Sequence, residues 1–134
     1  MAHKPRLSNL LVNAQAKALA ELLAGGWCEM RSGDPTEDPE EAPADDSLLV
    51  RCQFASVAFG APRDGELIAN KAERAQAIRT GDPNWVRLTT ADGAFIADGS
   101  LGTKNANAVV NVRTIVEGQF VDLTGFRYVI PKTL

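Results

Sequence analysis

The spacing of apolar residues changes near residue 25, and this change predicts one α-helix followed by β-strands. Between residues 9 and 24, apolar side chains recur every three or four positions, as they do along one face of a helix. Ser8 can cap the N-terminus, and Gly25 and Gly26 can end the helix in a left-handed turn. The stripe consists of Leu11, Ala14, Ala18 and Leu22, with Leu7, Leu10 and Leu23 beside it. We therefore predict an N-terminal helix over about residues 9–24 with this face buried.

The apolar face of this helix can pack against one of two surfaces. The face can pack against the rest of its own domain, which is the more common arrangement. Alternatively, the N-terminal segment is an arm that packs on a neighbouring subunit. In that second case Leu7, Leu11 and Leu22 are interface residues.

After residue 26 the apolar residues alternate, which is the pattern of half-buried strands. Residues 27–31 and 48–54 alternate in this way, and the second segment places Leu48, Val50, Cys52 and Phe54 on one face. Asp92 and Gly93 join two alternating segments, residues 84–90 and 94–98, and this dipeptide predicts a tight hairpin.

Further turns are predicted along the C-terminal half. Gly99 and Gly102 bracket a bend, residues 108–114 alternate again, and Glu117 with Gly118 turns the chain. Residues 119–130 then form one or two strands broken at Gly125. Seven or eight strands spaced about ten residues apart predict a mainly β fold, an antiparallel, jelly-roll-like β-sandwich with one N-terminal helix. Residues 1–134 fit a single domain of this kind.

An acidic, proline-rich segment separates the first two predicted strands. Residues 33–46 contain three prolines and no large apolar residue, which predicts an exposed loop. Its seven acids are Asp34, Glu37, Asp38, Glu40, Glu41, Asp45 and Asp46. The order of acids does not match a calcium-binding EF-hand loop, so we predict no metal here. The acids are instead candidates for contact with a basic surface of a partner.

Charge and composition exclude two classes of binding partner, nucleic acids and membranes. The chain has a formal net charge of −3, and without the acidic loop the rest carries +4. No stretch combines basic residues with interleaved aromatic ones, so we predict no nucleic-acid binding. No apolar run is long enough to cross a bilayer, and the N-terminus does not resemble a secretory signal, so we predict a soluble chain without a membrane partner.

The residues that most enzymes need are missing from this sequence. His3 is the only histidine and lies at the terminus, which argues against a catalytic triad, a zinc hydrolase or a zinc deaminase. Two acids could still meet across a sheet, for instance Asp92 with Asp98 or Glu66 with Asp122. We predict no catalytic residue and no cofactor.

The two cysteines lack the spacing of a metal site or a redox motif. Two buried, reduced thiols are the favoured state of Cys28 and Cys52, and one disulfide between adjacent strands is the alternative. Six aromatic residues sit in strand-like positions, where core packing is the commoner role, and any that prove exposed become interface candidates. They are Trp27, Trp85, Phe95, Phe120, Phe126 and Tyr128.

The order of these segments resembles a family of small structural proteins encoded by tailed bacteriophages and prophages. The matching segments are residues 7–24, 48–54, 57–61, 85–88 with Asp92 and Gly93, 98–102 and 115–126. The chain departs from the family in the longer acidic loop and in residues 66–78, which are rich in helix-forming residues. Because the family has β structure at the latter position, we predict two short strands there, joined at residues 70–73.

The resemblance implies a virion structural role without catalysis. We expect a capsid decoration or cement protein that binds major capsid subunits, assembles in the host cytoplasm and forms homo-oligomers. Two alternatives are a structural protein of the tail, neck or fibre base, and a small carbohydrate-binding sandwich that uses Trp27 or Trp85.

Overall fold

The computed structural model describes residues 5–133 and confirms the mainly β fold with an N-terminal helix. The described chain contains helix α1 (Asn9–Leu22), a short 3-10 helix η1 (Asp45–Ser47) and nine strands. The strands are β1 (Trp27–Arg31), β2 (Leu48–Gln53), β3 (Glu66–Ile68), β4 (Ala75–Gln76), β5 (Trp85–Thr89), β6 (Phe95–Gly102), β7 (Ala108–Val110), β8 (Phe120–Val121) and β9 (Leu123–Val129).

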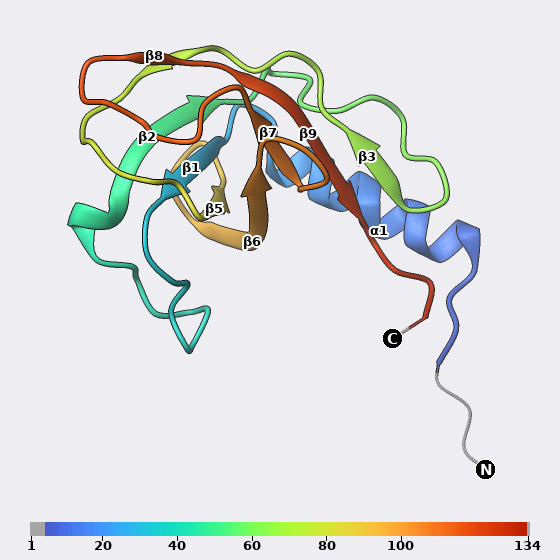
Figure 1. The fold of residues 1–134 in the computed structure, drawn as a ribbon. Coiled ribbons are helices and arrows are strands. Elements are labelled where there is room, and N and C mark those ends of the chain that lie inside the picture. Colours follow the sequence, from blue (N-terminus) through green and yellow to red (C-terminus); the bar gives the residue numbers. More distant parts are fainter. Residues whose placement is uncertain (1–4, 134) are drawn as a thin grey trace.

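Seven strands form one curled sheet in the order β2-β1-β5-β6-β7-β9-β3, and β4 pairs with β8 in a small second sheet (Figure 1). The Ile78 N–H donates to Leu49 O at 2.8 Å and the Glu73 N–H donates to Gln53 O at 2.9 Å. Residues flanking β4 therefore cover the outer edge of β2. Because β8 runs on into β9, the two sheets enclose the core in a sandwich-like fold.

The core lies inside the curled sheet. It consists largely of residues that the alternating apolar pattern predicted to be buried. Val50, Cys52 and Phe54 are buried, as predicted, whereas Leu48 of the same predicted face is half-buried and Leu49 from the other face is buried. Phe54 packs against Phe59 and Phe126 with ring centroids 5.6 and 5.4 Å away. Interlocking aromatic rings of this kind contribute beyond their buried area.

Helix α1 begins as predicted and ends two residues early. Ser8 Oγ accepts a hydrogen bond from the Leu11 N–H at 3.1 Å, which satisfies one of the free amides of the first turn. Gly25 has a φ of 66°, the left-handed conformation expected after a helix. The last helical residue is Leu22, whereas we predicted a helix to residue 24.

The prediction of which helix face is buried was wrong. Val12, Ala16 and Leu23 are fully buried, whereas Leu11 is 43% exposed and Leu22 is 50% exposed. The helix lies against the turn before β3, where Asn13 Oδ1 accepts from the Gly65 N–H at 2.7 Å. A side chain on Gly65 would lie 3.1 Å from Val12, so this close approach selects the stripe beside the predicted one.

Several strand predictions are confirmed. Residues 66–78 form β3 and β4 rather than a helix. Gly93, with a φ of 91°, turns β5 into β6, and Gly118, with a φ of 87°, turns the chain before β8.

Three details of the C-terminal half are corrected by the structure. Strand β6 continues through Gly99 to Gly102, and the bend falls at residues 103–107, where Asn107 Oδ1 accepts from the Ser100 N–H at 2.9 Å. Residues 111–114 are not a strand, and β7 pairs with β6 in parallel. The final strand breaks at Asp122 rather than Gly125, because β8 pairs with β4 while β9 pairs with β7 and β3.

Candidate protein interface

The acidic loop of residues 33–46 projects at the lower left of Figure 1, across the molecule from α1. Its seven carboxylate residues are all exposed. They are Asp34, Glu37, Asp38, Glu40, Glu41, Asp45 and Asp46. These predicted interface residues therefore form one solvent-facing surface, which we call the acidic loop surface.

A buried arginine holds the middle of this loop. Arg87 on β5 is 4% exposed and binds Asp98 on β6 through Nε and Nη2, at 2.8 and 3.1 Å. Its Nη1 donates to Glu41 O and its Nη2 donates to Pro39 O, both at 3.0 Å. A planar guanidinium can serve a carboxylate and a loop backbone together because its donors are arranged in a rigid fork.

Two further arginines hold the end of the loop. Arg31 Nη1 donates to Ser47 Oγ at 2.8 Å and to Ala44 O at 3.2 Å. Arg79 Nη1 donates to Asp45 O at 2.9 Å and to Leu48 O at 3.0 Å. Most of these acceptors are backbone carbonyls, so the arginines order the loop without neutralising its carboxylates.

The ion pairs of residues 5–133 leave the acidic loop surface uncompensated. They join Arg31 and Arg51 to Glu29, Arg87 to Asp98, and Arg127 to Glu66, and none includes a carboxylate of the loop. Asp38 Oδ1 accepts from the Glu40 N–H at 3.0 Å, which shapes the loop internally. The result is a concentrated negative surface on an ordered backbone.

Sequence reasoning missed the arginines that build this surface. The strand register places Arg51, Glu29, Arg87 and Asp98 opposite one another in a row across four strands. Alternating charges at these cross-strand positions favour the register. The alternation of residues 27–31 could have indicated that Glu29 and Arg31 share the outer face, but not that a loop covers it.

The loop also covers an aromatic residue that one alternative function needs. Trp85 is buried, and its Nε1 donates to Ser32 O at 3.3 Å. Trp27 is partly exposed, but the guanidinium of Arg51 lies 4.1 Å from its ring centroid. The two tryptophans therefore do not form an open platform on which a sugar could stack.

A second exposed feature is apolar and lies on the small sheet and on the segments next to it. Ile78, Val116 and Phe120 are 51%, 53% and 57% exposed, and we call them the β4–β8 patch. Hydrogen bonds of the Ala77 backbone with residues 118 and 119 join the two segments that carry these side chains, and the Arg74 guanidinium lies 4.7 Å from the Phe120 ring centroid. The contacts of Arg79 with Asp45 and Leu48 place this patch beside the end of the acidic loop. Phe120 is thus the clearest of the aromatic interface candidates.

The predicted leucines of the helix lie elsewhere. Leu11 and Leu22 are exposed on the outer face of α1, far from the acidic loop (Figure 1). Leu7 is partly buried, and its N–H donates to Lys132 O at 2.7 Å. The segment before the helix therefore lies against the C-terminal end of its own chain.

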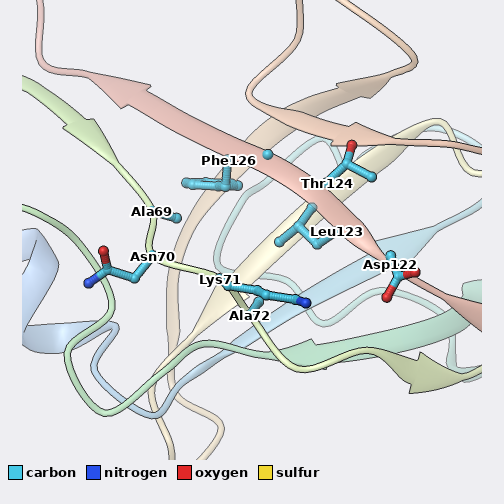
Figure 2. A pocket seen from close by; sticks show the side chains of 9 residues that line it. Ala69, Asn70, Lys71, Ala72, Asp122, Leu123, Thr124 and Phe126 are labelled. Atoms are coloured by element: carbon cyan, nitrogen blue, oxygen red, sulfur yellow. The ribbon is translucent and has the colours of Figure 1, made fainter.

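A cleft of about 480 Å³ opens where residues 69–72 separate from the start of β9 (Figure 2). Its walls carry Asn70, Lys71, Asp122 and Thr124, over apolar Leu123 and Phe126. Lys71 and Asp122 do not form an ion pair. In Figure 2 the Lys71 side chain is directed toward Asp122.

One acid of each pair considered from sequence forms an ion pair with an arginine. Asp98 binds Arg87, and Glu66 Oε2 lies 2.6 Å from Arg127 Nε. Residues 5–133 hold no group of three metal-ligating side chains. His3 lies outside the described residues.

The two cysteines are free, fully buried, and opposite each other on β1 and β2. Burial raises the pKa of the Cys28 thiol well above its usual range, and the neighbouring Cys52 adds to this. Burial also raises the pKa of the Cys52 thiol to about 11, with a smaller contribution from Asp122. In the folded chain both thiols are therefore mostly protonated near neutral pH.

None of the helices described in residues 5–133 has the length and hydrophobicity to cross a bilayer. Comparisons with protein-family models, with curated proteins and with solved structures give no match.

Proposed function

We propose that the protein is a capsid decoration protein of a tailed bacteriophage, which binds major capsid subunits through the acidic loop surface and the adjoining β4–β8 patch. Its role is binding rather than catalysis. The partner surface that fits it is basic, with an apolar depression for Phe120. A location in the tail or neck would use the same chemistry with fewer copies.

The observation that carries the proposal is the acidic loop surface itself. Seven carboxylates face solvent without ion-pair partners among residues 5–133, while buried arginines order the backbone beneath them. A disordered loop would lose conformational entropy on binding, and an ordered one loses less. An ordered, unneutralised surface is suited to an oppositely charged partner.

The β4–β8 patch supplies the apolar part of such an interface. Three large apolar side chains at more than half exposure, with an arginine stacked on Phe120, have the composition of an interface centre. Each contact is modest in size. On a shell with many symmetry-related copies, modest interfaces add up to firm attachment.

Charge removal on the loop tests the proposal. The variant Asp34→Asn, Glu37→Gln, Glu40→Gln, Glu41→Gln keeps Asp38, whose side chain shapes the loop. Binding is measured by co-sedimentation with empty capsid shells of the phage that encodes the chain. We expect the affinity to fall by about tenfold or more, because each lost charge pair at an interface costs a sizeable fraction of a tenfold change.

The matched control removes four exposed acids outside the loop: Glu21→Gln, Asp64→Asn, Glu73→Gln, Asp92→Asn. It changes the net charge equally and should bind as the unmodified chain does. Equal loss of binding in both variants would mean that only net charge matters. Unchanged binding of the loop variant, or binding to isolated tails instead of shells, would refute the capsid interface.

A further inference from the structure

Cys28 and Cys52 occupy directly opposite positions on antiparallel strands β1 and β2. Both side chains are fully buried and point into the same core. Opposite residues in antiparallel strands have Cα atoms about 4.5 or 5.5 Å apart, and both spacings lie within the range that disulfides span, about 4.4–6.8 Å. The two thiols therefore need little backbone movement to bond.

The register indicates which of the two spacings applies. The Phe54 N–H donates to Gly26 O at 2.8 Å, two residues along the same ladder. Because hydrogen-bonded and non-bonded pairs alternate, Cys28 and Cys52 occupy a hydrogen-bonded pair with the wider separation. Side chains at this kind of pair are less close than in most disulfides, so the bond is expected to carry some strain and to be more easily reduced.

We propose that Cys28 and Cys52 form a reversible cross-strand disulfide that locks the base of the acidic loop. Strands β1 and β2 flank this loop, so the bond would close a ring that contains all of it. The thiols are free in the structure, which is the reduced form. The inference concerns this chain's own redox chemistry and does not depend on a capsid partner.

The oxidant in this reaction is a small-molecule disulfide such as oxidised glutathione. As the chain folds, before burial raises the thiol pKa values, one cysteine thiolate attacks the oxidant, breaks its S–S bond and releases one molecule of thiol. The second thiolate then attacks the mixed disulfide, forms the protein S–S bond and releases the second thiol molecule. Two cysteine sulfurs are oxidised, the two oxidant sulfurs are reduced, and the two protons end on the released thiols.

The test compares the chain refolded from denaturant in reduced glutathione with the chain refolded in a mixture rich in oxidised glutathione. Alkylation in denaturant followed by mass spectrometry counts the free thiols. We expect two alkylated cysteines in the reduced sample. In the oxidised monomer we expect none, with a mass two hydrogens lower and an unchanged circular dichroism spectrum.

Thermal unfolding then shows whether the bond suits the native fold. Closing a ring of this size should raise the melting temperature by about 10 °C. Strain in the disulfide would make this increase smaller. The control is Cys52→Ser, whose hydroxyl can keep the contact with Val121 O that the Cys52 thiol makes at 3.8 Å. Its melting temperature should be the same in both buffers.

Four outcomes would overturn the proposal. These are free thiols after oxidative refolding, a stable glutathione adduct, a disulfide that joins two chains, and an oxidised monomer with a lower melting temperature or a changed spectrum. The measurements use the isolated chain, so their failure leaves the capsid proposal untouched. Likewise, a chain that does not bind capsids can still pass this test.

Discussion

Arg87 connects the sheet to the acidic loop at the level of a single side chain. Its guanidinium is buried, pairs with Asp98 on the next strand and also donates to two carbonyls of the loop. A buried charge is tolerated only when its donors are satisfied, and here the loop backbone provides that satisfaction. The position of the acidic residues thus depends on a residue nearly fifty positions away in sequence.

This dependence explains why the acidic loop could be predicted from the sequence and the arginines that hold it could not. The composition of residues 33–46 was enough to predict an exposed loop. The arginines on strands β1 and β5 look like ordinary outer-face residues in the alternation, because nothing local indicates that a loop folds over them.

Replacing Arg87 with lysine should destabilise the protein by about 2–4 kcal/mol, because a lysine cannot bind both Asp98 oxygens and the loop carbonyls at once. Urea unfolding measures the loss, and a glutamate-specific protease should cut the loosened loop faster. Arg113→Lys, at an exposed position, is the control and should change neither. Unaltered stability and cleavage in the Arg87 variant would show that the loop is held by other contacts.

At the scale of elements, helix α1 shows where the apolar pattern is ambiguous. The cap at Ser8 and the left-handed Gly25 were predictable because each is a local requirement of the backbone. The buried face was not, because two apolar stripes run side by side along the helix. The close approach of Gly65 selects between them, and that contact is tertiary.

Two adjacent leucines test which face is buried. Leu23→Ala should cost about 2–5 kcal/mol of unfolding free energy, because it leaves a cavity beneath a fully buried side chain. Leu22→Ala, at a half-exposed position, should cost less than about 1 kcal/mol. Denaturant titrations with both variants measure the difference. Similar losses, or a larger loss at Leu22, would mean that the helix packs through the other face.

Some strand boundaries likewise follow from local sequence, and others depend on tertiary contacts. The hairpin at Gly93 follows from its Asp-Gly dipeptide, whereas Gly99 and Gly125 lie within strands and Gly102 is the last residue of its strand. The break at Asp122 arises because β8 and β9 have different partners. Residues 66–78 favour a helix by propensity, yet they complete two sheet edges as strands.

At the scale of the whole molecule, two exposed apolar groups lie on different elements, one around β4 and β8 and one on α1. Arg79 joins the segment after β4 to the end of the acidic loop, while α1, which carries the exposed leucines, lies across the molecule from that loop (Figure 1). A molecule with two such sides can contact a shell with one and a neighbouring copy with the other. The resemblance to phage structural proteins in sequence order is compatible with this arrangement, and the capsid assignment stays a proposal.

Cryo-electron microscopy of the phage particle to which the proposal assigns this chain is the most direct test of the proposed function. We predict density for the fold repeated across the capsid lattice, with the acidic loop and Phe120 against basic and apolar residues of the major capsid protein. Density confined to the tail or neck, or a shell without this protein, would contradict the account.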